Sequence, residues 1–237
     1  MQIHIEQGSI CWFTEGVFSD PSPQLFNSNW WQERGLVVGT AIGRGVTWFV
    51  KGEDQHFVLR HYYRGGLMSK LSRDLFWFRS IESSRAMAEF SLLTTLCALN
   101  LPVPRPIGAR LVRQGPFYRA DILIARIEGA KDVVSILKQA AIASDTWHKI
   151  GQTIKQLHDA GVDHADLNSH NLLLDKTGKV WIIDFDKGAI RQPGGWQKAN
   201  LERLLRSLNK EAKLHTCFHF VPDNWDDLLL GYYGDKK

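Results

Sequence analysis

The sequence contains no long hydrophobic run and very little cysteine. No stretch approaches the ~20 consecutive apolar residues that a membrane-spanning helix requires, so we expect any membrane contact to be peripheral. The three cysteines, Cys11, Cys97 and Cys217, are far apart and odd in number. Their spacing predicts neither a metal site nor a disulfide framework, and it fits a reducing cytoplasm best. Met1 to Glu6 have neither a basic stretch nor an apolar core, so we expect no secretory signal.

The sequence also lacks internal repeats and low-complexity tracts. Of its 237 residues, 44% are apolar and 23% are charged, which is an ordinary globular composition. The length allows one large domain or two lobes. A repeat protein and a disordered chain are therefore excluded.

The positive charge is distributed unevenly along the chain. The net charge is +4, yet residues 60–119 contain ten Arg and Lys against three acidic residues, a local excess of +7 (10 − 3). Such an excess indicates an anionic partner: a nucleotide, a phosphorylated substrate, nucleic acid or an acidic membrane surface. A solvated face without a partner is the alternative, and charge alone does not decide between them.

The first half of the chain is predicted to be rich in β-structure. Residues 1–34 hold many aromatics and a proline-containing break at 19–23, so we interpret them as an irregular leader that packs on the first lobe. β-Branched and aromatic runs between Gly and Asp clusters then predict hairpin strands. The five predicted strands cover residues 35–40, 46–50, 56–63, 109–113 and 120–127. Apolar residues at three- and four-residue spacing predict one helix within residues 80–99.

The second half is predicted to be mainly helical. Residues 133–160 have mostly a helical pattern, which Gly161 would end. Short apolar runs at 172–174 and 180–183 flank a Gly-containing turn and predict a small hairpin. Two further helices are predicted over residues 201–214 and 225–233.

Three oxygen-bearing side chains follow one another in an order typical of phosphate-transferring enzymes. Asp166 lies in a predicted loop, Asn171 follows five residues later, and Asp184 ends the next apolar strand. Protein-kinase-like enzymes place a catalytic base and two magnesium ligands in this order. A carboxylate such as Asp166 can orient or deprotonate an acceptor hydroxyl, and the oxygens of Asn171 and Asp184 suit Mg²⁺.

Each of these residues has a plainer alternative when it is taken singly. An Asp often caps a turn or ends a strand without any chemical role. The combination nevertheless predicts phosphoryl transfer that depends on ATP and Mg²⁺. His164 is expected to pack and form hydrogen bonds behind the loop, and it is not included in the catalytic set.

The order of elements predicts an α+β fold with two lobes, as in protein kinases. Five strands and one helix come first, and a mainly helical part with one small hairpin follows. We expect residues 1–127 to form the leader and a β-rich nucleotide-binding lobe. Residues 128–237 would then form a small, mainly helical catalytic lobe.

Four residues of the first lobe are candidates for binding the nucleotide. Gly43 and Gly45 lie between two predicted strands, where glycine lets backbone N–H groups approach phosphates; a simple hairpin turn is the alternative. Arg60 stands on the third strand, where protein kinases usually have a lysine, and Glu89 on the helix is its natural partner. Two independent surface charges are the alternative. Because arginine is not equivalent to lysine at a phosphate, the sequence leaves open whether Arg60 or Lys51 reaches the nucleotide.

Residues 65–79 interleave basic residues with Leu, Met, Phe and Trp. A segment of this kind can bind an anionic lipid head group and dip into the membrane interface. Packing of its apolar residues beneath the lobe is the alternative.

Four segments carry a resemblance to a known family. His164–Asn171 and Ile182–Gly188 are similar to the small lipopolysaccharide-core kinases of Gram-negative bacteria. Leu59–Gly66 and Ala125–Gly129 resemble, more narrowly, kinases of 3-deoxy-D-manno-octulosonic acid (Kdo), so the likeness covers nearly the whole chain. The resemblance implies ATP-dependent phosphorylation of the Kdo sugar of a lipid A precursor at its 4-hydroxyl, in assembly of the lipopolysaccharide core. It also implies a peripheral position on anionic membrane at the cytoplasmic side of the inner membrane.

The chain departs from ordinary protein kinases beyond Asp184. Asp186 stands where a glycine is usual, which argues against a flipping Asp-Phe-Gly switch because Asp lacks the backbone freedom of Gly. Only residues 187–196 precede the next predicted helix, which favours a small-molecule or glycolipid acceptor over a protein. The rival interpretations are a small atypical protein kinase, an antibiotic-modifying kinase, and a non-catalytic kinase-like scaffold that binds anions. We expect a monomer with no nucleic-acid partner.

Overall fold

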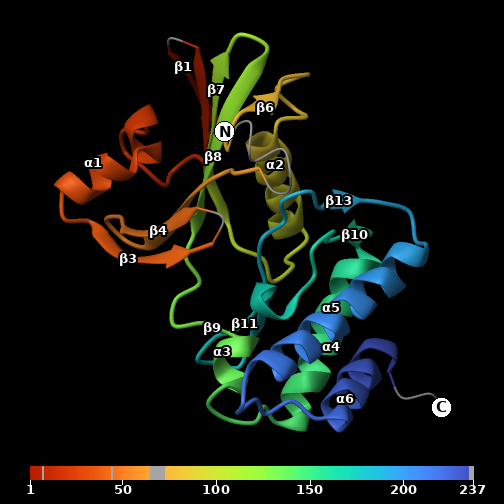
Figure 1. The fold of residues 1–237 in the computed structure, drawn as a ribbon. Helices are drawn as coiled ribbons and strands as arrows, with labels where there is room; N and C mark the ends of the chain where they lie inside the picture. The colour runs from red at the N-terminus through yellow and green to blue at the C-terminus, as the bar shows by residue number, and fades with distance from the viewer. Residues whose placement is uncertain (7, 44, 65–72, 235–237) are drawn as a thin grey trace. The chain divides into compact units, whose positions relative to one another are not determined.

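The chain divides into two compact units in the computed structural model, which describes all residues except 7, 44, 65–72 and 235–237 (Figure 1). The fold class is α+β, as the sequence predicts, with an antiparallel sheet in the first unit and mainly helices in the second. The first unit comprises Met1–Thr94 and Arg105–Arg126, and the second comprises Thr95–Pro104 and Ile127–Lys237. Among the described residues, no helix combines the length and the apolar character needed to cross a membrane.

An eight-stranded antiparallel sheet dominates the first unit. The strand order is β1-β2-β7-β8-β5-β4-β3, and β6 also pairs with β8. The strands are β1 (Gln2–Glu6), β2 (Ser9–Phe13), β3 (Val37–Ile42), β4 (Val46–Lys51), β5 (His56–His61), β6 (Phe76–Trp77), β7 (Pro106–Gln114) and β8 (Phe117–Ala125).

The prediction that residues 1–34 form an irregular leader is wrong. β1 and β2 form a hairpin, and β2 pairs with β7 along its whole length. The 3₁₀ helix η1 (Pro23–Phe26) and helix α1 (Ser28–Glu33) follow. The sheet therefore has eight strands rather than the five predicted. The β1–β2 hairpin was missed although its strands are neighbours in the sequence and Gly8 lies between them; only the pairing of β2 with β7 joins segments far apart in the chain.

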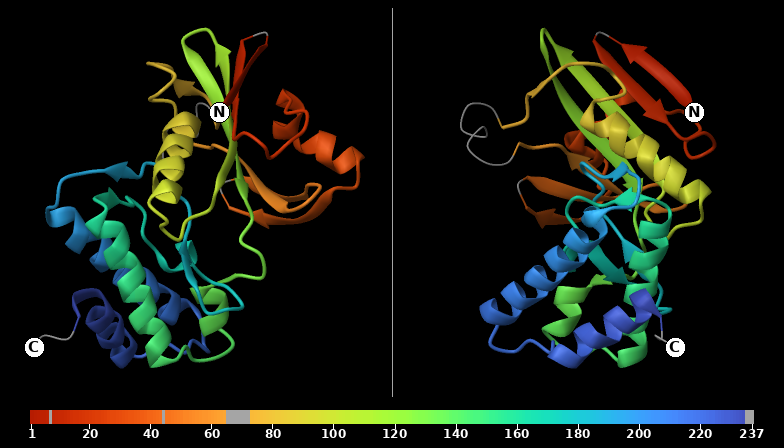
Figure 2. Two further views of the ribbon diagram at one scale, coloured as in Figure 1. Left: turned by 180° about the vertical axis from the view of Figure 1, so that it is seen from behind. Right: turned by 90° about the vertical axis from the view of Figure 1, so that its right-hand side faces the viewer.

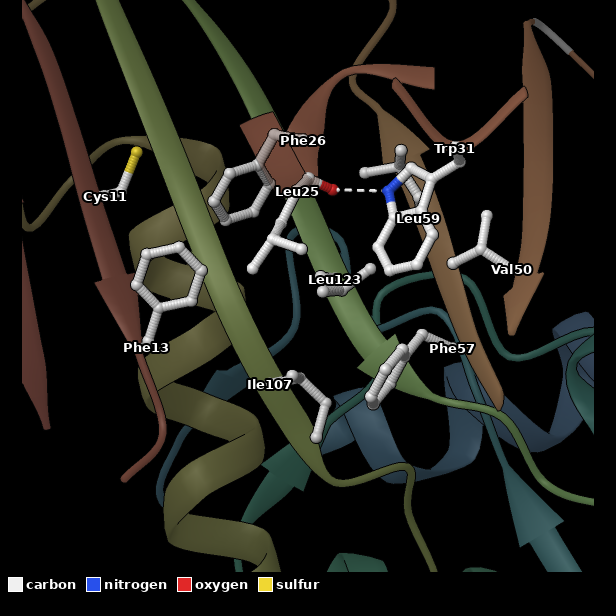
Figure 3. Close-up of a cluster of buried hydrophobic side chains, with 10 residues drawn as sticks. All are labelled: Cys11, Phe13, Leu25, Phe26, Trp31, Val50, Phe57, Leu59, Ile107 and Leu123. Carbon is white, nitrogen blue, oxygen red and sulfur yellow. Dashed lines mark hydrogen bonds between the residues drawn. The ribbon is translucent and has the colours of Figure 1, made fainter. Parts of the chain in front are cut away.

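Side-chain alternation along β5 gives the sheet two different faces. Phe57 and Leu59 point into an apolar cluster that also contains the η1–α1 segment, where the Trp31 Nε1 donates to the Leu25 carbonyl at 2.9 Å (Figure 3). Arg60 points the other way, towards α2 (Arg85–Ala98). Consequently η1–α1 and α2 cover opposite faces of the sheet (Figure 2). The cluster comprises Cys11, Phe13, Leu25, Phe26, Trp31, Val50, Phe57, Leu59, Ile107 and Leu123.

Helices make up most of the second unit. The helices are α3 (Val133–Leu137), α4 (Ser144–Asp159), α5 (Gly195–Leu214) and α6 (Pro222–Tyr233). The short strands are β9 (Lys131–Asp132), β10 (Val162–Asp163), β11 (Leu172–Leu174), β12 (Val180–Ile182) and β13 (Ala189–Ile190). The predicted hairpin is confirmed as β11–β12, whereas the helix predicted over residues 133–160 is interrupted between α3 and α4.

Candidate active site

Asp166 lies in the loop that follows α4 and β10. Three N–H groups converge on its oxygen Oδ1: Nε and Nη2 of Arg203, at 2.8 and 2.5 Å, and Nδ2 of Asn168, at 3.3 Å. No hydrogen bond joins Oδ2 to any residue that the structure describes. The side chain is 35% exposed. Oδ2 is therefore the oxygen that remains to accept a proton.

His164 connects the loop of Asp166 to the segment of Asp184. It is fully buried, its Nε2 lies 2.9 Å from the carbonyl oxygen of Ile183, and its ring centroid is 4.7 Å from that of Phe185. Burial lowers the pKa of His164, so the ring is neutral and its Nε2–H donates to that carbonyl. The predicted structural role of His164 is confirmed.

Asn171 ends the 3₁₀ helix η3 (Ser169–Asn171) and is 8% exposed. Its Nδ2 donates to the backbone carbonyl of Asp166 at 3.0 Å, and its own carbonyl accepts the N–H of Ile183 at 3.0 Å. Its amide oxygen Oδ1 has no hydrogen-bonding partner within the described parts of the chain. The amide nitrogen is thus committed to the backbone, and Oδ1 is left for a ligand.

Asp184 follows β12 in a left-handed backbone conformation, with φ at 65°. Asp tolerates this region better than most residues. Its two neighbours are anchored, Ile183 by Asn171 and Phe185 against His164. The backbone therefore brings Asp166, Asn171 and Asp184 to one place, as their spacing in the sequence predicts.

The donor set fits Mg²⁺. Within the described residues, no group of three or more His, Cys, Asp and Glu side chains could hold a metal. Asn171 and Asp184 instead offer one amide and one carboxylate oxygen. Magnesium prefers such hard oxygen ligands and keeps several of its waters, so two protein oxygens are sufficient.

One polar face of α5 contacts the loop of Asp166 and the η3 residues after it, and we define this face as the α5 brace: Asn200, Arg203, Ser207 and Glu211. The Oδ1 of Asn200 accepts the N–H of His164 at 3.2 Å. The hydroxyl of Ser207 lies 2.8 Å from that of Ser169, and Glu211 lies 3.3 Å from the His170 ring. Together with the Arg203–Asp166 pair, these contacts fix the loop at four points.

The sequence analysis missed the α5 brace, although a signal was present. The four residues recur at spacings of three, four and four, so they lie on one helix face, where Asn200 and Glu211 are buried, Ser207 is half-buried and Arg203 is exposed. Asn200 and Glu211 are only 5% and 7% exposed. Polar and charged residues are seldom buried to this degree unless they have a partner. A polar stripe on a helix that follows the segment of Asp184 in the chain indicates a loop that the helix supports.

Arg60 and Glu89 form an ion pair, as predicted. The Arg60 Nη2 lies 2.6 Å from both carboxylate oxygens of Glu89, and the Tyr62 hydroxyl donates to the same carboxylate at 2.6 Å. Glu89 is 3% exposed, so the pair is internal rather than two separate surface charges. Lys51, by contrast, is exposed at the end of β4. Which cation contacts a nucleotide stays a prediction.

Gly43 and Gly45 lie in the turn between β3 and β4, where the Gly43 N–H donates to the Gly45 carbonyl at 2.9 Å. A Cβ on Gly45 would lie 1.8 Å from the Tyr63 ring. The glycine is therefore required by packing, whatever its role with phosphate. Residue 44 lies outside the described residues.

The basic and apolar segment 65–79 is described only from residue 73. Phe76 is buried against Tyr118, whereas Trp77 on β6 is 61% exposed. The guanidinium of Arg113 stacks on Phe78 at 3.6 Å from the ring centroid. Phe76 therefore packs internally and Trp77 faces solvent, while binding of the segment to a lipid head group stays a prediction.

Comparisons with known proteins agree with this geometry. The model of the lipopolysaccharide kinase (Kdo/WaaP) family matches residues 28–232. A 3-deoxy-D-manno-octulosonic acid kinase of Vibrio parahaemolyticus is 47% identical over 211 residues, covering 89% of each chain. The protein of the same name from Photobacterium profundum is 43% identical over 93% of each chain, and that from Haemophilus influenzae is 41% identical over 90% of this chain and 92% of its own. The chain belongs to the lipopolysaccharide kinase (Kdo/WaaP) family.

Proposed function

We propose that this protein transfers the γ-phosphate of ATP to the 4-hydroxyl of the Kdo sugar on a lipid A precursor. The matched family and the names of the relatives support Kdo kinase activity in lipopolysaccharide core biosynthesis. The observation that carries the proposal is the hydrogen-bonded assembly of Asp166, Asn171 and the segment of Asp184.

Asp166 orients the acceptor hydroxyl and accepts its proton at Oδ2. Three donors hold Oδ1, so the carboxylate cannot rotate freely and its second oxygen has a defined direction. A positioned carboxylate of this kind contributes typically 10²–10⁴-fold to a rate. The proton moves from the hydroxyl to Oδ2 as the hydroxyl oxygen bonds to the γ-phosphorus, and the bond between that phosphorus and the β-phosphate oxygen breaks so that ADP leaves.

Asn171 and Asp184 would hold Mg²⁺ with their side-chain oxygens. When bound, the ion supplies neutralisation of the charge on the phosphates. The two residues contribute a fixed place for it, because Asn171 is anchored to the backbone of Asp166 and Asp184 lies between two anchored neighbours.

The nucleotide site includes Arg60, Glu89, Gly43 and Gly45. Glu89 holds the Arg60 guanidinium at 2.6 Å, which fixes the direction of this cation for a phosphate. The turn at Gly43 and Gly45 offers backbone N–H groups. In this proposal residues 1–127 bind the nucleotide and residues 128–237 carry the catalytic groups.

A glycolipid acceptor is supported by the short chain beyond Asp186. Residues 187–194 alone separate it from α5, and Ala189 and Ile190 of these pair with β10. This short segment leaves too little chain to form a binding platform for a peptide substrate. The names of the relatives indicate that the acceptor is the Kdo sugar.

Mass spectrometry of a Kdo–lipid A precursor after incubation with the protein, ATP and Mg²⁺ tests the function. We expect a gain of one phosphate that fragmentation places on the sugar. A lipid A precursor without Kdo, an aminoglycoside and a generic protein substrate serve as the control acceptors. Phosphate on a control acceptor alone would favour the rival kinases, and no transfer to any acceptor would favour a non-catalytic scaffold.

The protein acts as a monomer in peripheral contact with anionic membrane, at the cytoplasmic side of the inner membrane and without nucleic acid. The exposed Trp77, with Arg79 two residues later and Arg113 stacked on the adjoining Phe78, supports membrane contact. Tryptophan favours the membrane interface, and the cations attract anionic head groups.

A further inference from the structure

Arg203 uses only some of its N–H groups in the contact with Asp166. Its Nε and Nη2 form one edge of the guanidinium, and both donate to the same carboxylate oxygen. A guanidinium carries five N–H groups in a rigid fork. No hydrogen bond links Nη1 to any residue in the described ranges, and the side chain is 47% exposed. A second edge of Arg203 therefore faces solvent beside the carboxylate.

Simple ion pairing does not explain this arrangement. An ion pair exposed to this degree contributes little to stability. Both donors on Oδ1 also leave Oδ2 clear, so the contact positions Asp166 without blocking its second oxygen. Arg203 thus lies against the reacting carboxylate with donors still available for an anion.

We propose that Arg203 is a specificity-determining residue that binds the carboxylate of the acceptor sugar through its Nη1 edge. The inference rests on the proposed function, in which the acceptor is an octulosonic acid. The name of that sugar places its carboxylate on C1, next to C2, and a CH₂ at C3, and the proposed function places the reacting hydroxyl on C4. One CH₂ therefore separates the carbons that carry the two groups. A hydroxyl that reaches the Oδ2 of Asp166 brings its own carboxylate within range of the neighbouring guanidinium.

This placement couples recognition of the acceptor to the positioning of Asp166. One guanidinium edge fixes Oδ1 and the other fixes the acid group, so a neutral sugar would lack the second contact. A hydrogen bond to a charged group is strong enough to discriminate roughly 10- to 100-fold between acceptors. The other residues of the α5 brace, Asn200, Ser207 and Glu211, contact the backbone or side chains of the loop, and none of them is a cation.

The test compares two acceptors, the natural Kdo glycolipid and the same glycolipid with its carboxylate converted to the primary amide. For the wild-type protein we expect kcat/KM to be roughly 10- to 100-fold higher with the acid. Arg203→Gln should bring this ratio close to one, while the KM for ATP stays unchanged. Arg203→Lys, which keeps the charge, should retain part of the preference. Arg206→Gln is the matched control, because Arg206 lies one turn further on α5, is 68% exposed and pairs only with Glu202.

The outcomes separate the inference from the proposed function. If the wild-type protein phosphorylates the acid but Arg203→Gln keeps the full acid-to-amide ratio, Arg203 only positions Asp166 and the inference is overturned. If the wild-type protein phosphorylates neither acceptor, the proposed function fails and the inference fails with it. If Arg203→Gln is too slow to measure, calorimetric binding of the two acceptors replaces turnover. Loss of the affinity difference then supports the inference, and its survival overturns it.

Discussion

We propose that phosphate transfer depends most on the carboxylate of Asp166. Asp166→Asn keeps the size and the contacts of Oδ1 but removes the charge that accepts a proton. We expect kcat to fall at least about 100-fold, with the melting temperature nearly unchanged because the Arg203 pair is half-exposed. Asp145→Asn, at an exposed position in α4, is the control for turnover. Near-normal turnover by Asp166→Asn would remove Asp166 from the mechanism.

His158 makes the stability of the protein depend on pH. It is 1% exposed, its Nδ1 lies 2.8 Å from the Tyr232 hydroxyl, and burial lowers its pKa from the ordinary 6.5 to about 4. The unfolded chain therefore binds a proton more readily than the folded chain. The stability linked to His158 is present above pH 6.5 and is lost as the pH falls towards 4, by about 3 kcal/mol in total.

Urea unfolding of the wild type and of His158→Phe between pH 7 and pH 5 measures this effect. The difference in unfolding free energy between the two proteins should shrink by about 2 kcal/mol over that interval. His219→Phe, at an exposed position, is the control, and its unfolding free energy should change with pH by the same amount as that of the wild type. A constant difference between wild type and His158→Phe would show that His158 is not buried in its neutral form.

Helices α4 and α6 pack through two glycines. A Cβ on Gly151 of α4 would lie 2.0 Å from the Leu228 carbonyl oxygen, and one on Gly231 of α6 would lie 2.1 Å from the His148 carbonyl oxygen. In an ordinary helix, Gly→Ala is stabilising. In this pair the added methyl group would push the backbones of α4 and α6 apart. We therefore expect Gly151→Ala and Gly231→Ala each to lower the unfolding free energy by about 1–3 kcal/mol.

The control for this pair is Gly195 at the start of α5. A Cβ there meets nothing within 4 Å, so Gly195→Ala should leave stability unchanged or slightly raised. Denaturant unfolding of the three variants gives the comparison. Stabilisation by Gly151→Ala would contradict the close approach of the two helices.

Elements with local causes could be predicted from the sequence, and those with distant partners could not. The β11–β12 hairpin is fixed by Asp175, which accepts the N–H groups of Thr177 and Lys179 at 2.9 and 3.1 Å. Hydrogen bonds from Thr177 and then Trp181 lower the pKa of Asp175 to about 2. Every partner lies within six residues. The pairing of β2 with β7 and the packing of α1 on the apolar cluster, by contrast, join segments far apart in the chain. The β1–β2 hairpin is local and was missed all the same.

The same division applies to the candidate site. Asp166, Asn171 and Asp184 were predictable because the chemistry of phosphate transfer dictates their types and their order. Arg203 was not, because its contact with Asp166 requires the register between α5 and a loop 37 residues earlier in the chain. Gly45 was predicted from its place between two strands as a residue whose backbone would approach phosphate, and that role stays a prediction; the structure adds a packing reason for a glycine, the Tyr63 ring.

The protein as a whole is expected to bind anionic membranes reversibly. Flotation with vesicles that contain anionic lipid should recover the protein, and recovery should fall as salt is raised because the attraction is screened. Trp77→Ala should weaken binding several-fold, whereas Leu214→Ala, another exposed apolar position, should not. Equal binding to neutral and anionic vesicles would contradict an electrostatic contact.

The most direct experiment places wild type and Asp166→Ala side by side on a Kdo–lipid A precursor with ATP and Mg²⁺, and weighs the glycolipid by mass spectrometry. We predict that the wild type adds a single phosphate to the Kdo sugar and that Asp166→Ala adds none in the same time. Two results would contradict phosphate transfer to Kdo through Asp166. In the first, the folded wild-type protein leaves the glycolipid unphosphorylated; in the second, both proteins phosphorylate it equally.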